Sequence, residues 1–163
     1  MSDSKRSRAT VAVEHIKIAS TKAFAETKAA LERLVPELDQ GIFVLLREGE
    51  SERALEQLEA GPALARFLSR DHGSLLQIAG RQRQAVQYEI GNALTASRMT
   101  RHQLPAALYA PLRVLLYEDD SGQVAFEYDR PSSLFGQFGD ERVTAVAREL
   151  DASLERVLID AAS

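Results

Sequence analysis

Residues 71–74 read Asp-His-Gly-Ser and bring together the three side-chain types of a serine hydrolase. Such a triad works because the base reaches the nucleophile while a carboxylate orients the base, an arrangement that is recognised in space. Near neighbours in sequence cannot take up those three positions. We therefore interpret Asp71 as a helix cap and His72 as a solvated or packing residue, with catalysis as the weaker alternative.

The three histidines could bind a metal only if the fold brings them together. They are His15, His72 and His102, and Glu14 and Asp71 stand beside two of them. A zinc site needs three or four ligands, and no two of these histidines have the spacing that places both imidazoles on one helix face. Convergence from three distant elements remains an alternative, but we expect no metal site. The chain also has no cysteine, which excludes thiolate ligands, thiol catalysis and disulfides.

A glycine-containing segment, residues 128–139, precedes a predicted helix that begins at Asp140. Glycines before a helix N-terminus can let backbone N–H groups cradle a phosphate. This segment has no lysine, however, and Asp140 would place a carboxylate where the anion should lie. The pattern matches neither a P-loop nor a dinucleotide-binding fingerprint. We interpret the segment first as a rigid loop.

Four residues of this loop have expected structural roles. Asp129 and Arg130 are expected to form a local ion pair, and Phe135 and Phe138 to pack at the edge of the core or in a dimer interface. Loops nevertheless hold functional residues more often than packing alone would suggest. The loop is therefore where we expect a functional site.

The leading hypothesis is a homodimeric binding or interaction module without a cofactor, whose ligand pocket is formed by sheet residues and residues 130–139. Its expected polar contacts are Tyr109, Tyr117, Tyr128, Asp129, Arg130, Ser132 and Ser133. A guanidinium suits a carboxylate or a phosphate, so Arg130 favours a small anionic metabolite. The alternative is a small hydrolase or isomerase with an acid–base pair such as Asp129 with His102 or His72.

The elements that must position these residues include a β-hairpin. The strand Leu112–Glu118 and the strand over 123–128 both show the side-chain period of two that a half-buried sheet needs. Residues 119–122 between them are turn formers, and Gly122 can adopt the positive φ that closes a hairpin after a type I turn.

The rest of the chain gives one compact unit without a linker. It reads as a strand over 10–18, a helix from Ser20 or Thr21 to Pro36, a strand over 41–47, helices over 51–60 and from Pro62 to about Gly73, one or two helical turns over 74–79, a strand over 85–90, a short helix over 94–103 and a long amphipathic helix from Asp140. Helices on one face of a mainly antiparallel sheet fit this order better than a parallel sheet, which needs crossover helices. The sequence therefore predicts an α+β fold with the order β-α-β-(helical insert)-β-α-β-β-α.

Length and charge narrow the class of protein further. A chain of 163 residues is long enough for one domain with a real core, and we expect residues 10–163 to form it behind a disordered tail over residues 1–9. Basic side chains number 20 against 24 acidic ones, so no basic footprint for nucleic acid is expected outside the tail. No segment approaches a membrane span. We expect a cytoplasmic protein that binds neither nucleic acid nor membrane.

The chain resembles a bacterial and archaeal family, domain of unknown function 302, at five places. These are Gly91-Asn92, residues 108–115, Tyr117-Glu118-Asp119, Gly122 and residues 128–133. The resemblance implies an α+β fold like that of the TATA-box-binding protein, often as a homodimer, with no established activity or catalytic residues. Ala93 stands where the family usually has proline, and residues 50–84 are longer and more helical than in its short members.

Overall fold

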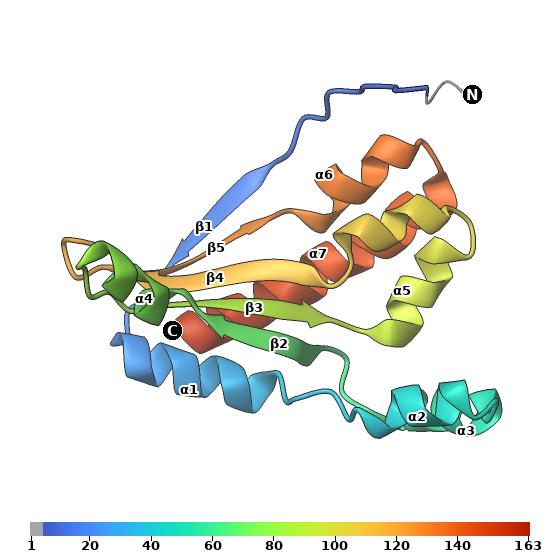
Figure 1. Cartoon of the computed structure of the whole chain (residues 1–163), viewed down its shortest axis with the longest axis horizontal. Coiled ribbons are helices and arrows are strands. Elements are labelled where there is room, and N and C mark those ends of the chain that lie inside the picture. The colour runs from blue at the N-terminus through green and yellow to red at the C-terminus, as the bar shows by residue number, and fades with distance from the viewer. Residues whose placement is uncertain (1–4) are drawn as a thin grey trace.

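The computed structural model describes residues 5–163, and it is built on a five-stranded sheet with the order β1-β5-β4-β3-β2. All four neighbouring pairs are antiparallel. The strands are β1 His15–Ala19, β2 Ala65–Asp71, β3 Ala85–Gly91, β4 Leu112–Glu118 and β5 Val124–Asp129. The predicted α+β class with a mainly antiparallel sheet is confirmed (Figure 1).

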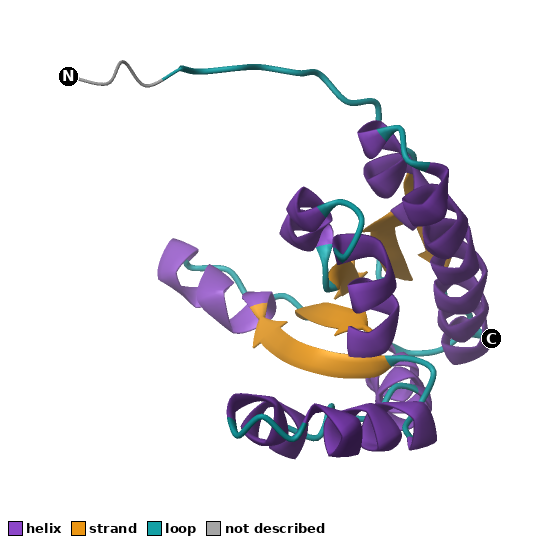
Figure 2. Cartoon of the chain, turned by 90° about the vertical axis from the view of Figure 1, so that its right-hand side faces the viewer, coloured by secondary structure: helices purple, strands orange, loops and turns teal. Residues whose placement is uncertain are grey.

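The helices are α1 Phe24–Leu34, α2 Gly41–Arg47, α3 Ser51–Ala60, α4 His72–Leu75, α5 Ala93–Thr100, α6 Pro131–Phe135 and α7 Glu141–Ala162, with short 3₁₀ turns η1 Leu76–Ala79, η2 Leu104–Tyr109 and η3 Gly136–Phe138. The two longest helices, α1 and α7, pack on one face of the sheet (Figure 1). The helix α7 passes behind the strands in Figure 1 and lies to one side of them in Figure 2. Leu31 of α1, Val114 of β4 and Leu154 of α7 are fully buried in one core.

The hairpin of β4 and β5 is confirmed. Its strands pair from Glu118 opposite Val124 to Val114 opposite Tyr128. Gly122 has a φ of 81°, the left-handed conformation that the turn requires. The Asp119 carboxylate accepts hydrogen bonds from Ser121 N and Gln123 N at 2.9 and 3.0 Å, so the side chain and the glycine fix the turn together.

Within the described part of the chain, no long helix covers the opposite face of the sheet, and we call it the open face. It presents His15 and Lys17 of β1, Glu127 and Asp129 of β5, Arg113, Leu115 and Tyr117 of β4, Gln87 and Glu89 of β3, and Leu68 and Arg70 of β2. Short helices flank it at its two ends: α4 with η1 at one, and η2 at the other (Figure 1). The open face therefore has raised ends and a polar middle.

The prediction of a strand over Gly41–Arg47 is wrong, because this segment is the helix α2. Periodicity cannot separate strand from helix in a short continuous apolar run. Ile42 and Leu45, three positions apart, are buried while Val44 and Leu46 are exposed, which is a helical pattern. With Ala54 of α3 they form a small apolar cluster separate from the main core.

The predicted helix from Pro62 to Gly73 is also wrong, since residues Ala65–Asp71 form the strand β2. This strand pairs with β3 along its length, with an irregularity between Arg66 and Leu68. Leu64 is buried as expected, but Leu68 is exposed on the open face. Long-range pairing decides the structure here, and the local pattern does not reveal it.

Two smaller expectations also meet a different structure. The first strand begins at His15 rather than at Thr10, and residues 130–139 form α6 and η3 rather than a loop. Phe135 is fully buried and Phe138 packs against the core, as expected. Of the predicted disordered tail, residues 1–4 lie outside the described part, and residues 5–9 have no helix or strand. No helix in the described part of the chain is long and apolar enough to cross a membrane.

Candidate functional site

The seven residues expected to contact a ligand lie in three places. Tyr117 and Asp129 belong to the open face, and Tyr109 lies beside it in η2. Tyr128 points to the opposite, helix-covered side of the sheet, where it is 4% exposed and where burial raises its pKa to about 12. Tyr128 is thus part of the core. Tyr109 and Asp129 line one cavity, and Tyr117 contacts Glu127 on the open face instead.

The other three expected contacts, Arg130, Ser132 and Ser133, lie at the start of α6, where their hydrogen bonds and ion pair stabilise the local chain conformation. The Ser133 hydroxyl donates to Arg130 O at 2.7 Å and accepts from Glu14 N at 3.0 Å. Ser132 N donates to an Asp151 carboxylate oxygen at 2.8 Å. Arg130 Nε lies 3.3 Å from Glu14 Oε2, so the expected ion pair between Arg130 and Asp129 is replaced by a pair with Glu14.

A polar network crosses β1, β5 and β4 on the open face. His15 Nδ1 lies 3.0 Å from Asp129 Oδ1, and His15 Nε2 lies 2.8 Å from Glu127 Oε2. Tyr117 donates its hydroxyl to the other oxygen of Glu127. Lys17 Nζ lies 3.8 Å from Glu127 and 5.4 Å from the centre of the Tyr117 ring.

The network favours the charged forms of His15 and Glu127. Hydrogen bonds to Asp129 and then to Glu127 raise the pKa of His15 above its usual value of 6.5. The hydrogen bonds from Tyr117 and His15 lower the pKa of Glu127. An imidazole between two carboxylates is stabilised in its doubly protonated form, because that form can donate from both nitrogens.

Next to this network lies a cavity of about 450 Å³ at the η2 end of the open face. Its sheet wall includes Glu89, Arg113 and Asp129, and its other wall includes Leu108 and Tyr109 of η2. Leu134 of α6 completes it. Of the seven residues expected to contact a ligand, Tyr109 and Asp129 line this cavity, and Leu134 is its contribution from the segment after β5.

Arg113 is the cationic side chain of this cavity. Glu89 stands opposite Arg113 in the strand register, but the Glu89 carboxylate pairs with Arg70 at 2.6 Å. Asp129 is likewise engaged by His15. Within residues 5–163, Arg113 takes part in none of the ion pairs that hold its neighbours, so its guanidinium can receive an anion.

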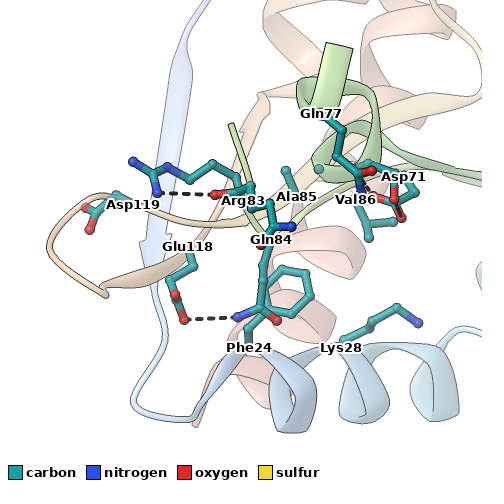
Figure 3. A pocket seen from close by; sticks show the side chains of 13 residues that line it. Phe24, Lys28, Asp71, Gln77, Arg83, Gln84, Ala85, Val86, Glu118 and Asp119 are labelled. Atoms are coloured by element: carbon teal, nitrogen blue, oxygen red, sulfur yellow. Dashed lines mark hydrogen bonds between the residues drawn. The ribbon is translucent and has the colours of Figure 1, made fainter. Parts of the chain in front are cut away.

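A second cavity, of about 470 Å³, lies at the opposite end of the sheet and is shown in Figure 3. Asp71 accepts hydrogen bonds there from Ser74 N at 2.9 Å and from the Ser74 hydroxyl at 2.5 Å. Asp71 is therefore the helix cap that the sequence predicted. A Cβ at Gly73 would lie 2.2 Å from Arg83 O, so the glycine lets two backbone segments meet. Residues 71–74 shape a turn rather than a triad.

The histidines do not form a metal site within the part of the chain that the structure describes, where no group of three His, Asp or Glu residues is placed to hold an ion. Asp129 is paired with His15 instead of His102 or His72, the partners named for an acid–base pair. The polar network on the open face thus contains His15, a histidine that the sequence analysis considered only as a metal ligand.

Sequence reasoning missed His15, Glu127 and Arg113 as site residues. Their signal is present, since all three occupy the polar positions of period-two strands. The pairing of β1 with β5 could not be read, because His15 and Asp129 are 114 positions apart. Without that register, a polar strand position predicts only a solvent-facing side chain.

Together these features define a class, an α+β protein with an antiparallel sheet that is helix-covered on one face and polar on the other. The model of the family described as "Domain of unknown function DUF302" matches residues 48–161. The chain belongs to this family, as the resemblance indicated.

One solved structure supports the same fold. It is the crystal structure of an uncharacterized conserved protein DUF302 from Bacillus stearothermophilus, with a TM-score of 0.67 and 18% sequence identity. The alignment covers 91% of this chain and 98% of that one. Among curated proteins, none matches the chain. The likeness to the TATA-box-binding protein that the family resemblance implied stays a prediction.

Proposed function

We propose that this protein is a small-molecule-binding module whose ligand is a small carboxylate or phosphate held in the cavity beside η2. The observation that carries the proposal is the guanidinium of Arg113, which lines a cavity of about 450 Å³ while its neighbouring carboxylates are engaged elsewhere. Arginine binds both anions through two parallel hydrogen bonds. Tyr109 and Leu108 offer an aromatic and an apolar surface to the rest of the ligand.

Binding fits the site better than acid–base catalysis, which is the alternative. The pair of His15 and Asp129 has a suitable distance of 3.0 Å, and Asp129 lines the cavity. A general base, however, needs a free lone pair, and both ring nitrogens of His15 are occupied by carboxylates. If a turnover is found whose pH profile is unchanged in His15→Gln, the pair has no part in it.

We further propose that the module is a homodimer that forms through the open face. Large apolar side chains stand at both raised ends of that face: Ile78 in η1 is 90% exposed and Leu108 in η2 is 80% exposed. Leu68 is exposed on the sheet surface between them. Large apolar side chains that are exposed on a surface are a kind of residue that protein interfaces bury. Because the cavity beside η2 opens onto this face, a second copy would help to close it.

The ligand proposal is tested by thermal denaturation in the presence of a panel of small carboxylates and phosphates. The protein, Arg113→Met and Arg156→Met are compared, since Arg156 is an exposed arginine of α7 and the matched substitution removes the same charge. We expect compounds that raise the melting temperature of the protein and of Arg156→Met but have little effect on Arg113→Met. If Arg113→Met keeps every stabilising compound, or if none stabilises the native protein, the proposal is wrong.

A further inference from the structure

A third cavity, of about 250 Å³, lies where α2, the end of β2 and α5 meet. Three phenylalanines from distant parts of the chain line it, Phe43 of α2, Phe67 of β2 and Phe135 of α6. The whole chain has only six phenylalanines and no tryptophan, so half of them gather around this space. Met99 of α5 adds a polarizable thioether to the wall. Methionine sulfur makes favourable contacts with aromatic rings.

The polar residues of the cavity have their hydrogen bonds satisfied by the protein. Asn92 accepts from Thr95 N at 3.0 Å and donates to Ala63 O at 3.1 Å. The hydroxyls of Ser97 and Thr100 donate to backbone carbonyls of α5 at 2.7 and 3.1 Å. No charged residue lines the space. A ligand here would meet a mainly apolar surface, on which the hydroxyl oxygens of Ser97 and Thr100 can still accept a hydrogen bond.

The size and depth of the cavity distinguish it from an ordinary packing defect. Protein interiors are close-packed and hold few voids larger than a water molecule. Apolar cavities remain dry, and one of about 150 Å³ is already large enough to bind benzene. The floor here is part of the main core, with Met99 only 1% exposed and Phe135 fully buried. The rim is formed by partly exposed residues, Phe43 and Ala96, so the space is accessible from the surface.

We propose that this cavity is a second binding site, which takes an uncharged aromatic molecule of about the size of indole. Aromatic rings pack edge-to-face or offset against one another, and the partly exposed rings of Phe43 and Phe67 offer such contacts above a floor that contains Phe135. This cavity and the one at Arg113 are neighbours, since residues 110–112 line both. The site proposed here differs from the anion site, because the described residues that line it are uncharged. It therefore does not depend on the function proposed above.

Indole itself is a suitable probe because the chain has no tryptophan. Its fluorescence can be excited where the protein does not absorb, and the change on titration gives an affinity. We compare the protein with Ala96→Leu, which places a larger side chain in the cavity, and with Ala145→Leu, the same change at an exposed position of α7. We expect saturable binding to the protein and to Ala145→Leu, weakened by about tenfold or more in Ala96→Leu.

A second measurement uses the native chain and does not depend on the folding of a variant. Its two methionines are Met1 and Met99, so labelling the methionine methyl groups for NMR gives one reporter inside the cavity. Bound indole should shift the Met99 methyl signal by its ring current and show a nuclear Overhauser effect to it. Absence of saturable binding, equal affinity of Ala96→Leu, or a Met99 signal that indole leaves unchanged would each overturn the proposal.

Discussion

At the scale of single residues, the most informative contact is that of His15 with two carboxylates. Its ring spans β1 and β5 and lies 3.0 Å from Asp129 and 2.8 Å from Glu127. When the imidazole is charged, it is attracted to two neighbouring carboxylates on the open face and offsets part of their charge. When the imidazole is neutral, those acids lose this partner, so the protonation of His15 contributes to the stability of the β1–β5 pair.

This contact predicts a dependence of stability on pH. The folded-state pKa of His15 is raised above its usual 6.5, so its contribution is fully present below that value and is lost as the pH rises through the raised pKa. Urea unfolding should therefore show stability that falls as the pH rises from below 6.5 through the raised pKa of His15. In His15→Gln the fall should be smaller, while in His102→Gln, the control, it should be unchanged. An equal fall in all three proteins would show that His15 has no such role.

The residue scale also shows what sequence can predict of a site. Asp129 and Tyr117 were named from the sequence and lie in the polar network, because the hairpin that carries them is a local structure with clear signals. Arg113 was not named, although it belongs to the same hairpin. It becomes a candidate only when the fold shows that Glu89 is paired elsewhere and that η2 closes a cavity over it. Such facts depend on contacts between distant parts of the chain.

At the scale of elements, residues 41–71 show where local sequence patterns fail to predict the secondary structure. The hairpin β4–β5 and the helix α7 were predicted because their periods of two and 3.6 are unambiguous. The helix α2 and the strand β2 were each assigned to the wrong type. The helix α2 is too short for the helical period of its apolar residues to be recognised. The strand β2 forms because it pairs with β3.

The assignment of α2 as a helix can be tested at Val44, which is exposed. Alanine has a higher helix propensity than valine by about 0.5 kcal/mol and a lower strand propensity. We expect Val44→Ala to raise the free energy of unfolding in urea by about that amount. A decrease would be the behaviour of a strand and would contradict the helix.

The start of α7 offers a second test at this scale. Asp140 is its N-cap and accepts a hydrogen bond from Arg142 N at 3.0 Å, and its contacts with the Arg142 side chain lower the pKa of the Asp140 carboxyl. Asp140→Ala should lower the free energy of unfolding by about 1 kcal/mol. Asp160→Ala, near the other end of the same helix, removes the same charge where the helix dipole disfavours it, and it should cause no loss. Equal losses would show that capping is not the cause.

At the scale of the whole molecule, the proposed dimer is tested by sedimentation velocity over a range of concentrations. Ile78→Glu introduces a charge at one raised end of the open face, and Ile159→Glu makes the same change on the exposed side of α7. We expect the native protein and Ile159→Glu to dimerise and Ile78→Glu to sediment as a monomer. A native protein that is monomeric throughout, or an Ile78→Glu dimer as tight as the native one, would exclude this interface.

The small apolar cluster of Ile42, Leu45 and Ala54 is separate from the main core, and this separation has a consequence for hydrogen exchange. A unit with so little buried surface can open without unfolding the sheet, so amides of α2 and α3 should exchange faster than those of β4. Phe43 of α2 is also one wall of the aromatic cavity. A ligand in that cavity would contact both Phe43 of α2 and residues of the main core. Ligand binding should therefore slow the hydrogen exchange of the amides of α2 and α3.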